Sequence, residues 1–176
     1  MRPKMDGLCR TLGLCVVSVA GLSLAAAALG VRINTSYSLP MGLYIATSDS
    51  AAPFVEFCPK GRFAEESSAR GYRTRGFACA DGGVPLLKPV IAREGDTVET
   101  TASGIRVNGV LLPKTAPLTR DAESRMLTPW PFSFYVVQPG TIWVASTYNR
   151  GSYDSRYMGP IETSQLRRRL RALWTF

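Results

Sequence analysis

Two residues of this chain, a serine and a lysine fifty positions apart, are of the types needed for acyl transfer. Ser38 lies in the stretch 34–44, which reads Asn-Thr-Ser-Tyr-Ser-Leu-Pro-Met-Gly-Leu-Tyr, and Lys88 is the one lysine in the apolar run 85–92. The chain contains no histidine, so a nucleophilic serine has no imidazole base and a Ser-His-Asp triad is excluded. The remaining well-known option is a Ser-Lys pair, in which a lysine with a lowered pKa removes the serine proton.

A lysine can act as a base only if its surroundings disfavour the protonated form. Burial in a low-dielectric environment lowers the pKa of an amine by up to several units, and Lys88 is flanked by the apolar side chains Leu86, Leu87, Val90 and Ile91. The alternative is a lysine at a strand edge whose alkyl stem covers apolar surface while its amine reaches water. These residues alone leave both interpretations open.

The first 31 residues of the chain predict a membrane anchor. Residues 1–10 are short and basic, and residues 11–31 carry no charged side chain, which is long enough to span a hydrocarbon core of about 30 Å as a helix. The positive flank places the N-terminus inside. We therefore expect a cytoplasmic tail at 1–10, a transmembrane anchor at 11–31 and a periplasmic domain at 32–176. The alternative is a cleaved signal peptide, with small residues for cleavage at 25–28.

The composition indicates a globular domain with a basic surface. Hydrophobic residues make up 45 % and charged residues 19 % of the chain, with a net charge of +8, and such a charge suits nucleic acid or anionic membrane. Its distribution favours membrane, because the basic residues cluster before the apolar run and at 167–171. We expect no nucleic-acid partner, no cofactor and no metal, since zinc sites that use histidine are excluded.

The four cysteines divide into two pairs. Cys9 and Cys15 lie in or beside the apolar run, where they are expected to be small buried hydrophobes. Cys58 and Cys79 are 21 positions apart without C-x-x-C spacing, which argues against a metal site. If this part of the chain lies outside the cytoplasm, a disulfide is the favoured use.

Residues 32–176 predict a mainly β fold. Apolar and alternating segments bounded by turn residues predict strands at 42–46, 86–92 and 97–101, and hairpins at 105–112 (around Asn108-Gly109) and 134–145. Residues 47–83 are expected to be a loop excursion, and 113–133 a proline-rich connection. Residues 162–174 are ambiguous: a leucine stripe opposite the arginines favours either a helix on an anionic membrane or a last element packed on the domain.

Four blocks of this sequence resemble the type I signal peptidase family, and most closely its conjugal-transfer branch, the TraF-type pilin-processing peptidases. The blocks are 36–44, 87–96, 105–109 and 149–159, and Cys58 and Cys79 fall where that branch places a cysteine pair. Leu39 replaces the methionine usual in housekeeping enzymes, and there is little room for their second domain. Both departures favour the conjugal branch over a general secretory role.

The resemblance implies a serine endopeptidase and a role for each matching residue. Ser38 is the expected nucleophile and Lys88 its general base. The backbone N–H of Ser38 and the hydroxyl of Ser36 are the expected oxyanion donors. Ser152 is expected to orient the lysine amine, and Asp154 and Arg156 to support the site as an ion pair.

The resemblance also implies a place and a substrate. The protein is expected in the bacterial inner membrane as a single-pass protein, processing exported precursors, such as conjugative pilin subunits, as part of a conjugation or secretion apparatus. Its acyl-enzyme could be resolved by water or by the pilin's own amine, which yields a cyclic product. The alternative is a non-enzymatic periplasmic scaffold of that apparatus.

Overall fold

The computed structural model describes residue 21 and residues 29–176. The expected tail at 1–10, most of the anchor at 11–31, and Cys9 and Cys15 lie outside the described residues. The end of the expected anchor is not helical: residues 29 and 30 form a turn and Val31 begins a strand. Within the described residues, no helix is long and apolar enough to cross a membrane.

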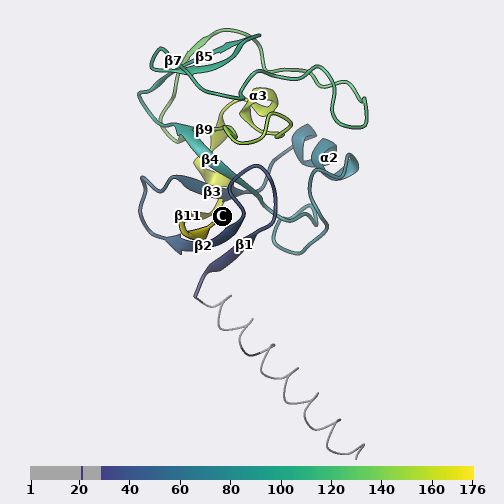
Figure 1. Cartoon of the computed structure of the whole chain (residues 1–176), viewed down its shortest axis with the longest axis vertical. Coiled ribbons are helices and arrows are strands. Elements are labelled where there is room, and N and C mark those ends of the chain that lie inside the picture. Colours follow the sequence, from purple (N-terminus) through teal and green to yellow (C-terminus); the bar gives the residue numbers. More distant parts are fainter. Residues whose placement is uncertain (1–20, 22–28) are drawn as a thin grey trace, which may run out of the picture.

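Residues 29–176 form a mainly β structure built on two sheets (Figure 1). The larger sheet has the strand order β1-β2-β11-β3-β4-β9-β10 within this part of the chain. Its strands are β1 (Val31–Asn34), β2 (Gly42–Thr47), β3 (Phe54–Phe57), β4 (Leu86–Ala92), β9 (Thr141–Val144), β10 (Ile161–Glu162) and β11 (Leu166–Thr175).

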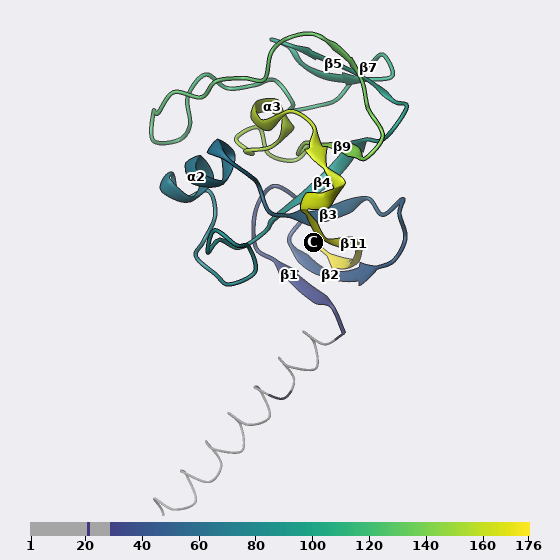
Figure 2. The ribbon, with the colours of Figure 1, turned by 180° about the vertical axis from the view of Figure 1, so that it is seen from behind.

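The smaller sheet has the order β7-β6-β5-β8 and lies at the opposite end of the molecule from β1 and β2 (Figures 1 and 2). Its strands are β5 (Thr97–Thr101), β6 (Gly104–Val107), β7 (Val110–Leu111) and β8 (Phe134–Val136). Asn108 and Gly109 connect β6 to β7 with positive φ angles of 49° and 83°. The Asn-Gly pair adopts this left-handed turn readily, which confirms the predicted hairpin.

Strand β4 is central to the hydrophobic core. Leu86 packs in the cluster around Phe57 and Val144, Leu87 in the cluster of Leu39 and Tyr44, and Ala92 in the cluster of Val98 and Trp143 that joins the two sheets. The near-continuous apolar run of this strand is what a strand covered on both faces requires. A lysine in its middle is therefore surrounded by core.

The pairing of β4 with β9 is short and irregular. It includes Val90 and Ala92, with an irregularity between them, whereas the β3–β4 pairing runs from Leu86 to Pro89. Just after β9, the backbone N–H of Ala145 donates to the carbonyl oxygen of Pro89 at 3.2 Å. The chain that follows β9 therefore runs alongside β4 toward Lys88.

Two sequence-based expectations about the elements were wrong, and the structure settles one alternative that the sequence left open. The excursion at 47–83 contains the core strand β3 and the helix α2 (Arg62–Ala69). The segments 134–137 and 141–145 are strands but not a hairpin, because β8 pairs with β5 while β9 pairs with β4 and β10. The C-terminal segment is the strand β11 rather than a helix, with Leu170 buried and most of its arginines exposed.

Gly42 allows β11 to lie close to the turn after β1. It has a φ of 143°, and a Cβ at this position would overlap the carbonyl oxygen of Trp174. A side chain here would have to displace backbone, which cannot give way as a flexible side chain can. The glycine of the 34–44 stretch is thus required by the register between β2 and β11.

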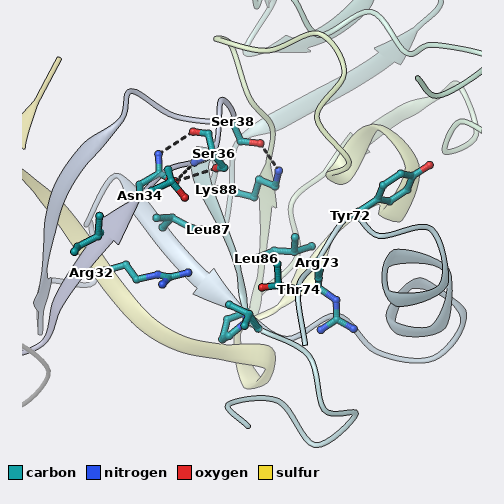
Figure 3. A pocket seen from close by; sticks show the side chains of 14 residues that line it. Arg32, Asn34, Ser36, Ser38, Tyr72, Arg73, Thr74, Leu86, Leu87 and Lys88 are labelled. Carbon is teal, nitrogen blue, oxygen red and sulfur yellow. Dashed lines mark hydrogen bonds between the residues drawn. The ribbon is translucent and has the colours of Figure 1, made fainter. Parts of the chain in front are cut away.

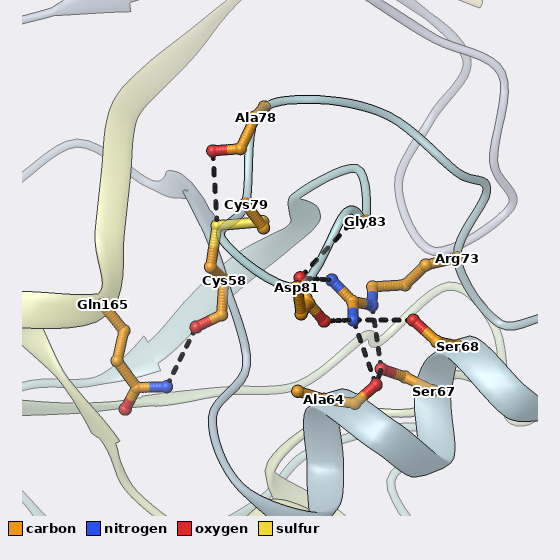
Figure 4. Close-up of a disulfide and its surroundings, with 10 residues drawn as sticks. All are labelled: Cys58, Ala64, Ser67, Ser68, Arg73, Ala78, Cys79, Asp81, Gly83 and Gln165. Atoms are coloured by element: carbon orange, nitrogen blue, oxygen red, sulfur yellow. Dashed lines mark hydrogen bonds and ion pairs between the residues drawn. A yellow bond between two sulfur atoms is a disulfide. The ribbon is translucent and has the colours of Figure 1, made fainter.

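The insertion 58–84 is cross-linked by a disulfide and by an ion pair between the buried Arg73 and the exposed Asp81 (Figure 4). Cys58 and Cys79 form the predicted disulfide, with Cα atoms 5.7 Å apart. Arg73 is fully buried and contacts Asp81, and its guanidinium also donates to Ser67 and Ser68 of α2. Both links fix the chain between α2 and β4.

Reduction of the disulfide should destabilise the protein. Closing a loop of this length restricts the unfolded chain and stabilises the fold by about 3 kcal/mol, so reductant should lower the denaturant midpoint of the detergent-solubilised full chain. The double variant Cys58→Ala/Cys79→Ala is the control, because its midpoint should already be low and insensitive to reductant. An unchanged wild-type midpoint after complete reduction would contradict a stabilising role.

Candidate active site

Ser38 lies in the turn between β1 and β2, and Asn34 organises that turn. The Asn34 side-chain amide donates to the carbonyl oxygens of Ser36 and Pro40, each at 3.0 Å, and its Oδ1 accepts from the backbone N–H of Ser36 at 3.1 Å (Figure 3). Tyr44 donates to the same Pro40 carbonyl at 2.7 Å. The turn therefore has a defined shape, and Ser38 is only 7 % exposed.

Lys88 extends from β4 to meet this serine. Its Nζ lies 2.7 Å from Ser38 Oγ and 2.7 Å from Ser152 Oγ, and the two hydroxyl oxygens are 3.2 Å apart. The residue is 4 % exposed. The structure therefore brings Ser38, Lys88 and Ser152 into mutual contact, although they come from three separate parts of the chain.

The surroundings of Lys88 favour its neutral form. Burial lowers the pKa of Lys88 to about 8, with Asp154 raising it and Arg156 lowering it. Removing a cation from water disfavours the charge because the low-dielectric interior solvates it poorly. Of the two interpretations of this lysine, the buried amine holds, and the strand-edge lysine that reaches water does not.

Asp154 and Arg156 form a fully buried ion pair behind the serine and lysine. Arg156 donates to both carboxylate oxygens, through Nε at 2.8 Å and Nη2 at 2.7 Å. Burial raises the pKa of Asp154, but Arg156 outweighs burial and holds it below its ordinary value. Asp154 also caps the short helix α3 (Ser155–Met158) by accepting from the backbone N–H of Arg156.

The guanidinium of Arg156 also holds the loop that follows β9. It donates to the carbonyl oxygens of Lys114, Asn149 and Arg150, at 3.0, 3.3 and 2.7 Å. Because Ser152 lies between this loop and Asp154 in the sequence, the ion pair limits where the Ser152 hydroxyl can lie. This arrangement agrees with the supporting role expected for the pair.

Ser36 lies in the same turn as Ser38, and its hydroxyl bonds to Asn34. Its Oγ donates to Asn34 Oδ1 at 2.9 Å. A serine hydroxyl has one proton to donate, so service as an oxyanion donor requires rotation out of this bond. Ser36 does line the cavity next to Ser38 (Figure 3).

A cavity of about 340 Å³ opens beside Ser38 and Lys88. One wall is β1 with the turn after it, and the other is the segment 72–74 of the disulfide-closed insertion (Figure 3). The start of β4 and the residues just before it also line the cavity. An extended segment of another chain could therefore lie along β1 with its backbone near Ser38.

Two residues that organise the site were not predicted from the sequence. Asn34 was noted only as the first residue of the 34–44 stretch, and Ser146 was not singled out, although its Oγ donates to the Ser38 carbonyl at 2.7 Å. A buried asparagine that makes several bonds to one turn has no local sequence signature. Among the described residues, no group of three or more His, Cys, Asp or Glu side chains could hold a metal ion.

Comparison with known proteins places these features in a family. A plasmid transfer protein TraF from Escherichia coli is 36 % identical over 170 residues, covering 93 % of this chain and 94 % of the relative. A conjugal transfer protein TraF from Agrobacterium tumefaciens is 35 % identical over 166 residues, covering 91 % of each. Among solved structures, a signal peptidase I from Enterococcus faecalis is similar with a TM-score of 0.38 and 18 % identity, covering 72 % of this chain and 99 % of that one.

The family assignment rests on the length of the matching region and on the sequence identity to the relatives. Residues 17–175 match the family described as "Signal peptidase, peptidase S26", and the TraF relatives align along nearly their whole length. The match includes the nucleophile turn, β4 and the 146–156 region. This chain belongs to the signal peptidase family, peptidase S26, and is homologous to the TraF conjugal transfer proteins.

Proposed function

We propose that this protein is a serine endopeptidase that uses Ser38 and Lys88 to process exported precursor proteins. The observation that carries the proposal is the 2.7 Å contact between Ser38 Oγ and a buried lysine amine whose pKa is lowered to about 8. Membership of a peptidase family supports the reaction class. The names of the plasmid and conjugal transfer relatives support a role in conjugation, and we propose conjugative pilin subunits as the substrates.

The acylation step follows from these contacts. Ser38 Oγ attacks the scissile carbonyl carbon while neutral Lys88 accepts the hydroxyl proton. The resulting ammonium then returns a proton to the leaving amine as the carbon–nitrogen bond breaks, which leaves an acyl-enzyme on Ser38. Ser152 accepts a hydrogen bond from the lysine amine throughout and keeps it aimed at the serine.

Stabilisation of the developing oxyanion needs preorganised donors, each worth about 3 kcal/mol to the barrier. We assign this role to the backbone N–H of Ser38 and to the Ser36 hydroxyl after it rotates away from Asn34. Water then attacks the acyl-enzyme to release a linear product. Attack by the product's own amine would instead yield a cyclic peptide.

The proposed setting is the bacterial inner membrane, with residues 1–10 cytoplasmic, an anchor that begins at residue 11 and ends at the turn of residues 29 and 30, and the domain after it periplasmic. A pilin precursor is cut just beyond a membrane-spanning segment, and Ser38 follows that turn by eight residues. The disulfide between Cys58 and Cys79 supports an oxidising compartment for the domain.

Removal of the nucleophile should abolish processing. Membranes that carry Ser38→Ala should cleave a candidate conjugative pilin precursor at least about 10⁴-fold more slowly than wild type, because no covalent intermediate can form. Mass spectrometry of the product would also distinguish a linear peptide from a cyclic one, which is lighter by one water. Equal processing by both proteins, with both folded, would favour the non-enzymatic scaffold.

The rate should follow the deprotonation of Lys88. With a lysine pKa of about 8, the neutral fraction and hence kcat/KM should rise roughly 50-fold between pH 6 and pH 8 and then level off. Lys88→Arg should be inactive at every pH because a guanidinium stays protonated. Lys60→Arg, at an exposed lysine that pairs with Glu162, is the matched control, and a flat wild-type profile would argue against lysine as the base.

A further inference from the structure

We propose that Ser146 is a positioning residue that holds the backbone of the nucleophile, an inference that rests on the proposed peptidase function. Ser146 follows β9 and is fully buried. Its Oγ lies 2.7 Å from the carbonyl oxygen of Ser38, which is 108 residues away in sequence. It therefore contacts the nucleophilic residue directly, but on its backbone and not on its reactive hydroxyl.

The hydrogen bonds of Ser146 determine the direction of its proton. Its Oγ accepts from the backbone N–H of Tyr148 at 3.1 Å and from that of Asn149 at 2.9 Å. A hydroxyl offers one donor and two acceptor positions, so both acceptor positions are filled. The single proton must go to the Ser38 carbonyl, which cannot donate in return.

The backbone of Ser146 is itself held by the buried ion pair. Its backbone N–H donates to Asp154 Oδ2 at 3.0 Å. The carbonyl oxygens of Asn149 and Arg150 accept from Arg156, so the loop beyond Ser146 is tied to the same ion pair. Ser146 thus connects the Ser38 carbonyl, through its hydroxyl, to the buried Asp154–Arg156 pair, through its backbone N–H.

Two serine hydroxyls from one region of the chain therefore hold both members of the reacting pair. Ser152 contacts the amine of Lys88, and Ser146 contacts the carbonyl of Ser38. Fixing the Ser38 carbonyl limits rotation about the Cα–C bond of Ser38, and so helps to fix the direction in which its side chain and Oγ point. Misplacement of a reacting group by about 1 Å can cost on the order of 100-fold in rate, so loss of the Ser146 bond should reduce turnover.

If Ser146 had only a structural role, its loss would reduce stability and leave turnover unchanged. Ser155 provides the comparison. Ser155 is as deeply buried as Ser146, and its Oγ accepts from the backbone N–H of Val144 at 3.0 Å. Among the hydrogen bonds of the described residues, its hydroxyl makes none to the Ser38 turn. Loss of either hydroxyl should reduce stability, but only loss of Ser146 should reduce turnover.

The test compares Ser146→Ala, Ser155→Ala, Ser38→Ala and wild type as full chains in membranes, with a candidate conjugative pilin precursor. We expect Ser146→Ala to lower kcat about 10- to 100-fold while KM stays within about twofold. The pH midpoint should stay at the wild-type value, because the contacts of Lys88 are retained. Ser155→Ala should keep kcat within about twofold of wild type, even if its Tm falls as far as that of Ser146→Ala.

If Ser146→Ala does not fold, Ser146→Cys replaces it in the test. A thiol has a similar shape to a hydroxyl but is a weak donor, so we expect a similar loss of kcat. A kcat for the Ser146 variant no lower than that of Ser155→Ala would overturn the inference, and so would a rise in KM alone. Equal processing by wild type and Ser38→Ala would instead overturn the proposed function itself, so the two failures are distinguishable.

Discussion

The contact of a buried lysine amine with two serine hydroxyls is the interaction on which the rest of the structure depends. An amine in water is protonated at pH 7 and cannot accept a proton, so the fold must keep Lys88 out of water while Ser38 stays open to a cavity. Strand β4 meets the first condition because it contacts all three clusters of the core. The turn that carries Ser38 meets the second condition, because it lines the cavity beside the start of β4.

A buried carboxylate near this lysine would by itself oppose its function. Asp154 raises the pKa of Lys88, whereas Arg156 lowers it. The paired guanidinium therefore offsets part of the carboxylate's effect on the pKa of Lys88, while the carboxylate caps α3 and binds the N–H of Ser146. Buried ion pairs often contribute little to net stability. What this pair supplies is a fixed geometry for the loop that contacts both Ser38 and Lys88.

The second wall of the cavity depends on a part of the chain with few core residues of its own. The insertion 58–84 contributes Tyr72 and Thr74 to the cavity, but few of its side chains lie in the core clusters. The disulfide and the Arg73–Asp81 ion pair compensate for this by cross-linking the insertion. The shape of the cavity is thus determined by covalent and ionic links on one side and by the β sheet on the other.

The sequence by itself determined the strands with strong local patterns, the Asn108-Gly109 hairpin and, through the lack of histidine, which base Ser38 could use. These features depend on neighbouring residues or on composition. Tertiary structure decided that β8 and β9 lie in different sheets, that the C-terminal segment is a strand, and that Ser146 reaches the Ser38 carbonyl. Strand pairing and buried hydrogen bonds join residues distant in sequence, and their free energies depend on which groups the whole fold removes from water.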